Sequence, residues 1–169
     1  MPTSDELKQR LNNAAMTERG EFVMAELVSE VIDPETDLEI VRQHFADLIA
    51  PIAERTPVDV GCLLGFFREV GFVNQRSGAA DLSHSNLQWV LAQRQGLPIT
   101  VAALLIEAAR RYGISAHGIN YPGHFLVSIE RKVVDPLSLR ILQQRQFGEK
   151  LSTEQLQDVL RPTLTSVFG

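Results

Sequence analysis

Apolar residues recur every third or fourth position through the first two thirds of the chain. This period predicts helices over 21–32, 34–50, 57–70 and 99–112, and a shorter one over 85–95. Two starts are expected at the pairs Asp33-Pro34 and Thr56-Pro57, because the first residue can cap a helix and proline suits its first turn. Gly71 and Gly113 are the expected stops of two of these helices.

The hydrophobic period changes after Gly113. Strands are predicted over 114–121, 124–129 and 132–135, with turns at Pro122-Gly123 and at Glu130-Arg131. The polar stretch 74–85 is typical of a loop, and a capping-box pattern at 152–155 predicts a last short helix. Helices followed by an antiparallel sheet predict the α+β fold class.

Size and charge restrict the function classes. The chain has 169 residues, 44% of them hydrophobic, which suits one globular domain. Its net charge of −5 argues against a nucleic-acid partner, which needs a basic surface. The longest apolar run, 101–106, is far too short to span a membrane, and no targeting segment is visible. We therefore expect no membrane partner and a cytoplasmic location. The one cysteine, Cys62, allows no internal disulfide and is expected to be buried.

Acidic residues concentrate in the first third of the chain. Residues 1–60 hold five Lys and Arg against thirteen Asp and Glu. We expect an acidic helical portion, 1–57, packed on a core, 58–169, as one compact unit. Two interpretations of the acidic portion remain open: a surface that attracts a partner, or a set of solvent-facing helices.

A narrow polar stripe runs along the otherwise apolar helix 99–112. At about 100° per residue, Thr100, Glu107 and Arg111 lie within about 40° of one another. Glu107 and Arg111 are four residues apart, in the favourable order for an ion pair. The apolar neighbours of Glu107 predict that it is shielded from water. The stripe is a structural ion pair, a helix edge that meets water, or part of a site.

His124 and Asp135 are expected on one face of the predicted hairpin. A two-residue turn pairs even-numbered with odd-numbered positions, and paired positions share a face. A carboxylate on the same face could orient an imidazole, as a catalytic dyad requires. The alternative is that His124, which follows a turn, is a structural hydrogen-bonding group.

Four motifs occur in order along the second half of the chain: QGLPI at 95–99, EAARRYG at 107–113, YPGHFLV at 121–127 and VDP at 134–136. Their order and spacing resemble the bacterial transglutaminase-like proteins, and among these the SirB-type branch. The resemblance covers roughly 60–137. It implies a papain-like α+β core, in which a central helix packs on a small antiparallel sheet.

The resemblance also implies a catalytic triad with one member replaced. In catalytic relatives a cysteine at the start of the central helix acts with a histidine and an aspartate on adjacent strands. His124 and Asp135 match the last two, whereas the cysteine position falls at or beside Thr100. The SirB-type branch commonly has a hydroxyl residue there. An alcohol is a much weaker acid than a thiol, so Thr100 would need a general base. Cys62 lies far from this position in the sequence.

Other positions are expected to be structural or to line the cleft. One such place is His84-Ser85, where many relatives have Asn-Ser. Gly123, which precedes the matching histidine, is another. Glu107 and Arg111 are also expected to be structural or to line the cleft. The four histidines show no metal-ligand spacing and no phosphate loop is present, so neither a metal nor a cofactor is expected.

Three function hypotheses remain open. The first is a non-catalytic binding or regulatory module, a pseudoenzyme, with a protein or peptide partner. The second is a hydrolase or acyltransferase that uses Thr100 with His124 and Asp135. The third is an interaction protein that acts through its acidic helices. The missing cysteine favours the first.

Overall fold

The computed structural model describes residues 3–15, 19–74, 81–122 and 124–143. Its elements are, in chain order, α1 (Ser4–Ala15), α2 (Gly20–Ile32), α3 (Leu38–Ile49), η1 (Ala50–Glu54), α4 (Val60–Glu69), β1 (Val73–Asn74), η2 (Leu82–Ser85), α5 (Leu87–Gln93), β2 (Gln95–Gly96), α6 (Pro98–Arg111), β3 (Ala116–Tyr121), β4 (His124–Ile129), β5 (Lys132–Asp135) and β6 (Arg140–Ile141). Helices precede an antiparallel sheet, which confirms the α+β fold class. The helix predicted after 152 lies outside the described residues. No helix in the described ranges is long and apolar enough to cross a membrane.

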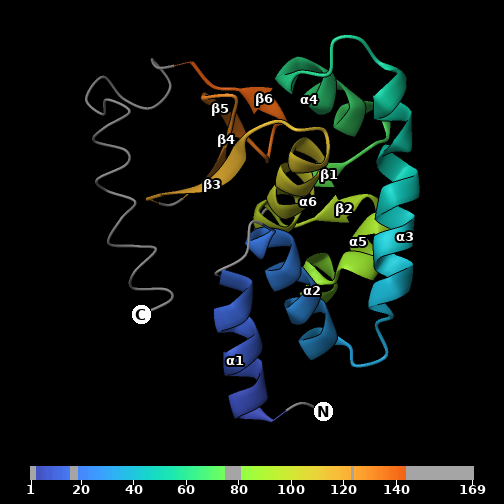
Figure 1. Ribbon diagram of the computed structural model, residues 1–169, viewed down its shortest axis with the longest axis vertical. Helices are drawn as coiled ribbons and strands as arrows, with labels where there is room; N and C mark the ends of the chain where they lie inside the picture. The colour runs from blue at the N-terminus through green and yellow to red at the C-terminus, as the bar shows by residue number, and fades with distance from the viewer. Residues whose placement is uncertain (1–2, 16–18, 75–80, 123, 144–169) are drawn as a thin grey trace.

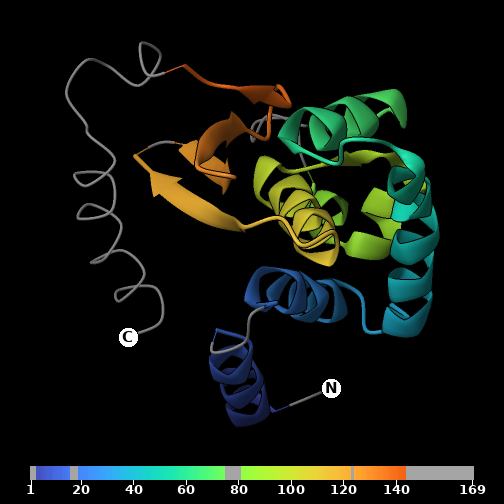
Figure 2. The ribbon, with the colours of Figure 1, turned by 45° about the horizontal axis from the view of Figure 1, so that its top comes forward.

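Helix α6 lies at the centre of the fold. Figures 1 and 2 show the sheet β3–β6 on one side of it, α3 and α5 on the other, and α2 below. Ten of its fourteen residues are buried. A helix that is apolar on nearly all sides must be covered on all sides, which explains why neighbours surround α6.

The four strands of the main sheet follow chain order, each antiparallel to the next. Ile129 of β4 pairs with Lys132 of β5, so Glu130 and Arg131 form the predicted two-residue turn. Both turn residues have positive φ, 51° and 65°, as a type I′ turn requires. The remaining strands, β1 and β2, form a separate short parallel pair.

Two predicted helix starts are wrong by a few residues. The cap of α3 is Asp37 rather than Asp33, which instead ends α2. The cap of α4 is Asp59 rather than Thr56. A capping carboxylate accepts hydrogen bonds from N–H groups two or three residues further on, so it must directly precede the first turn. Both prolines lie upstream of that point, in the linkers.

Three glycines have positions that a side chain would disturb. Gly71 and Gly113 follow α4 and α6 with φ of 87° and 74°, which confirms them as stops. Gly118 of β3 lies under the ring of Phe125, and a Cβ there would come within 2.6 Å of the ring. This close approach lets Phe125 pack against the core.

A buried polar network joins α2 to the start of α5. The Asn86 side chain donates to Thr36 Oγ1 at 2.8 Å and to the Ser29 carbonyl at 3.2 Å. Ser29 Oγ accepts from the N–H of Leu87 at 2.8 Å. Because α5 leads through β2 directly into α6, this network holds the chain that positions the central helix.

Candidate functional site

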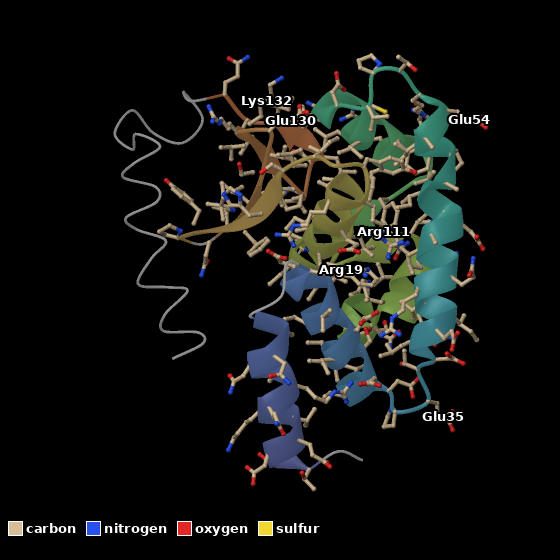
Figure 3. All side chains as sticks on the ribbon, in the orientation of Figure 1. Arg19, Glu35, Glu54, Arg111, Glu130 and Lys132 are labelled. Carbon is tan, nitrogen blue, oxygen red and sulfur yellow. The ribbon has the colours of Figure 1, made fainter. Side chains whose placement is uncertain are left out.

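A buried carboxylate joins α6 to the start of α2. Glu107 is 1% exposed, and its Oε1 accepts from Arg19 Nε at 2.7 Å and from Arg111 Nε at 3.1 Å. The ion pair expected from the four-residue spacing is therefore confirmed, and so is the shielding of Glu107. Its other oxygen, Oε2, is buried without a hydrogen-bond partner among the described residues. Figure 3 labels both arginines, Arg19 just before the start of α2 and Arg111 at the end of α6.

Two aromatic rings support these arginines. The Arg111 guanidinium lies over the ring of Phe45 at 4.9 Å and over that of Phe22 at 5.7 Å. The Arg19 guanidinium lies over the ring of Phe22 at 5.8 Å. The rings of Phe22 and Phe45 stack on each other, with their centroids 5.4 Å apart. Cation–π attraction and the shared carboxylate together hold the arginine side chains in place.

A second buried carboxylate holds a third arginine. Glu26 of α2 is 3% exposed and accepts from Arg42 Nε at 2.7 Å and Nη2 at 3.1 Å. The hydrogen bonds to Glu26 raise the pKa of Arg42 above its ordinary value. This two-bond geometry is the strongest arrangement of an arginine with a carboxylate.

The three arginines line a groove of about 410 Å³ between α2, α3 and α6. Its lining consists of Arg19, Glu39, Arg42, Gln43, Ala46 and Arg111. We call it the arginine groove. Arg19 and Arg42 were not expected from the sequence, because each pairs with a glutamate on a different helix and no local spacing links them.

The predicted nucleophile position is nearly closed. Thr100 is the third residue of α6 and is 4% exposed. Its N–H donates to the carbonyl of Leu97, the residue that precedes the helix. No hydrogen bond joins its hydroxyl to His124 or Asp135 among the described residues.

The predicted histidine and aspartate share a face of the sheet, as the parity of the hairpin required. The register pairs Val127 with Val134, and both belong to the core around α6. His124 is three residues from Val127 and Asp135 is next to Val134, so both lie on the face turned away from α6. The structure therefore does not bring Thr100 together with them.

The surroundings of each residue agree with this separation. His124 is exposed and is the first residue of β4. The Asp135 carboxylate accepts from the N–H of Leu137 and from Ser138 Oγ, both at 2.9 Å. Among the described residues, the hydrogen bonds of the Asp135 carboxylate are therefore made within the turn that follows β5, and none of them comes from the imidazole of His124.

His84 has a structural role at the start of α6. The residue is 7% exposed, and its ring lies 4.7 Å from the Trp89 ring and takes part in a capping box with Asp81. Hydrogen bonds from Ser83 hold the pKa of the Asp81 carboxyl below its usual value. The His84 carbonyl accepts from the N–H of Leu97 at 3.1 Å and so anchors the residue before α6.

Three further expectations have different outcomes. Ser85 is half-buried beside His84, whereas Gly123 lies outside the described residues. The expectation of a buried Cys62 is wrong, because it is half-buried at the edge of the core, on the first turn of α4. The described ranges contain no cluster of His, Cys, Asp and Glu able to hold a metal ion.

Comparison with known families decides the relationship of this chain. The model of the transglutaminase-like superfamily matches residues 41–166, which is most of the sequence. The chain belongs to the transglutaminase-like superfamily. The match includes α6, the sheet and the positions of Thr100, His124 and Asp135.

Curated bacterial relatives carry the name "UPF0162 protein". That of Vibrio cholerae is 28% identical over 160 residues, which cover 81% of this chain and 59% of the relative. That of Xylella fastidiosa (strain 9a5c) is 36% identical over 100 residues, 58% of this chain and 34% of the relative. That of Pseudomonas aeruginosa is 34% identical over 108 residues, 62% of this chain and 38% of the relative. The match thus spans between about a third and three fifths of these relatives. No solved structure gives a significant match.

Proposed function

We propose that this transglutaminase-like chain belongs to the SirB-type branch and works as a non-catalytic binding or regulatory module with a protein or peptide partner. The observation that carries the proposal is the absence of a cysteine from positions 99–101, where the family resemblance implies one; Thr100 is the hydroxyl residue among them. A binding module needs the shape of the domain but no nucleophile.

The chemistry of a threonine at this position supports the proposal. A helix N-terminus stabilises a negative charge by about 0.3–1 kcal/mol, which is far too little to ionise an alcohol. Thr100 would therefore need a general base during attack. The base that the family resemblance supplies, His124, is exposed on the sheet face turned away from α6. The branched Cβ of Thr100 and its burial restrict the approach of a substrate further.

An acylation assay tests the proposal. The protein carrying Cys62→Ala, which removes the one thiol, is mixed with p-nitrophenyl acetate and the early release of nitrophenol is followed. We expect no burst, and we expect the same slow release after the further change Thr100→Ala, because the hydroxyl is not activated.

The opposite result would favour a hydrolase or acyltransferase. A burst equal to the protein concentration, lost in Thr100→Ala and in His124→Ala, would require the two residues to meet in solution. That outcome would contradict a non-catalytic role and would make Thr100 the nucleophile.

A further inference from the structure

The arginine groove lies apart from the residues that the family resemblance assigns. None of Thr100, His124 and Asp135 lines it. Its volume of about 410 Å³ falls within the range of roughly 300–1,000 Å³ that is common for small-molecule sites. The groove therefore has the size of a ligand site, and its lining shows which ligand chemistry it suits.

Each arginine of the groove binds its glutamate through one edge of the guanidinium group. Arg42 uses Nε and Nη2 on Glu26, and Arg111 uses Nε on Glu107. Within the described residues, no hydrogen bond is made by Nη1 of Arg19 or Arg42, or by either Nη of Arg111. Three cationic groups with unused N–H donors thus line one groove.

The fold holds these donors in place before any ligand arrives. The buried carboxylates fix one edge of each guanidinium, and the rings of Phe22 and Phe45 support Arg19 and Arg111 from below. Binding to side chains that are already ordered costs less conformational entropy than binding to free surface arginines. This support distinguishes the groove from an ordinary set of exposed arginines.

We propose that the arginine groove binds an oxyanion, namely the phosphate or carboxylate group of a small-molecule ligand. A guanidinium edge donates two parallel N–H bonds, which match two oxygens of either group. The glutamates behind the arginines neutralise part of their charge and Glu39 adds a further acid to the lining, so the affinity for a bare anion is modest, about millimolar. The site goes beyond the binding role proposed above and does not depend on whether Thr100 is catalytic.

Two near-isosteric changes on α3 test the site without breaking its ion pairs. Glu39→Gln removes the acid of the lining, and Gln43→Glu adds one. Both residues are exposed, so the fold should survive, which circular dichroism checks. Glu35→Gln is the matched control for the first change, since Glu35 lies in the turn before α3, and Figure 3 shows it away from both labelled arginines. Gln9→Glu on α1 is the control for the second.

The full chain and its variants are titrated by calorimetry with sodium phosphate and, separately, with glutarate, at constant ionic strength. We expect saturable binding of at least one anion, about three- to tenfold tighter in Glu39→Gln and about as much weaker in Gln43→Glu. Neither control variant should change the affinity for the anion, and Thr100→Ala should not change it either. Saturation by phosphate alone, by glutarate alone or by both identifies the oxyanion that the groove takes.

Two results would overturn the proposal. One is the absence of saturable binding by either anion to the folded wild-type chain and to Glu39→Gln. The other is a control variant that shifts the affinity as much as the groove variant of the same charge change, because the anion would then respond to overall charge rather than to the groove. Failure here leaves the acylation result untouched, so the two proposals are tested independently.

Discussion

At the scale of single residues, Glu107 shows how α6 tolerates a charge at its centre. A carboxylate that is 1% exposed is strongly destabilising unless charged donors compensate for the lost water. Arg111 comes from the same helix, one turn on, and Arg19 from the segment before α2. The carboxylate therefore also fixes α2 against α6, which forms one wall of the arginine groove.

Replacing Glu107 should lower stability by an amount that depends on the new side chain. Glu107→Ala leaves a cavity and two arginines without their partner, but both reach solvent, so we expect a loss of about 2–3 kcal/mol, below the full cost of an isolated buried charge. Glu107→Gln keeps the volume and an acceptor, and should cost about 1–2 kcal/mol. Urea denaturation measures both, and Glu54→Ala, at an exposed position, is the control. Equal stability of Glu107→Ala and wild type would show that the ion pairs of Glu107 with Arg19 and Arg111 contribute nothing to the free energy of unfolding.

At the scale of elements, the β4–β5 hairpin uses a turn that its residues do not favour. Glu130 and Arg131 both adopt positive φ, which costs an ordinary residue roughly 1–2 kcal/mol relative to glycine. Type I′ turns prefer Asn-Gly for this reason. The hairpin nevertheless keeps its register, because Val127 and Val134 are paired and fully buried in the core. Packing thus overrides the local preference of the turn.

The turn predicts a stabilising change. Exchanging Glu130-Arg131 for Asn-Gly should raise the free energy of unfolding by about 1–2 kcal/mol, since the new residues accept positive φ readily. Glu130→Pro should have the opposite effect, because proline fixes φ near −65°. Thermal unfolding followed by circular dichroism compares the three proteins. A Glu130→Pro variant as stable as the Asn-Gly variant would contradict the observed turn.

At the scale of the whole molecule, the sheet decides which residues can act together. One face carries Val127, Ile129 and Val134 onto α6, and the other carries His124 and Asp135. Thr100 belongs to α6 and is buried near its start. The family resemblance pairs His124 and Asp135 with the triad histidine and aspartate, and puts the missing cysteine at or beside Thr100. In this structure α6 packs on one face of the sheet, and strand parity places the His124 side chain on the other.

A thiol placed at position 100 tests this arrangement. In a Cys62→Ala background, Thr100→Cys should have the same thiol pKa with and without His124, because an imidazolium lowers a thiol pKa only from within about 4–6 Å. The pH dependence of alkylation by iodoacetamide measures both values. A clear rise of the thiol pKa on His124→Ala would mean that the two side chains meet, and that the separation seen here is not maintained in solution.

The sequence by itself determined most of the longer elements and the local pairs, whereas it did not predict α1 or the two-residue strands β1, β2 and β6. The helical period predicted α2, α3, α4 and α6, the alternation after Gly113 predicted β4 and β5 with their turn, and the four-residue spacing predicted the Glu107–Arg111 ion pair. The parity of a two-residue turn even placed His124 and Asp135 on one face. These features depend on neighbours along the chain, and the geometry of a helix or a strand fixes where such neighbours lie.

The tertiary structure alone decided which face of the sheet meets the helix and which distant charges meet each other. Alternation along a strand separates two faces but does not say which one the core covers. Arg19 binds Glu107 across 88 residues, and Arg42 binds Glu26 across 16, with no periodic signal for either pair. Both contacts exist because α2, α3 and α6 pack together, and that packing depends on the burial of all three apolar stripes at once. The arginine groove and the separation of Thr100 from His124 are consequences of this packing.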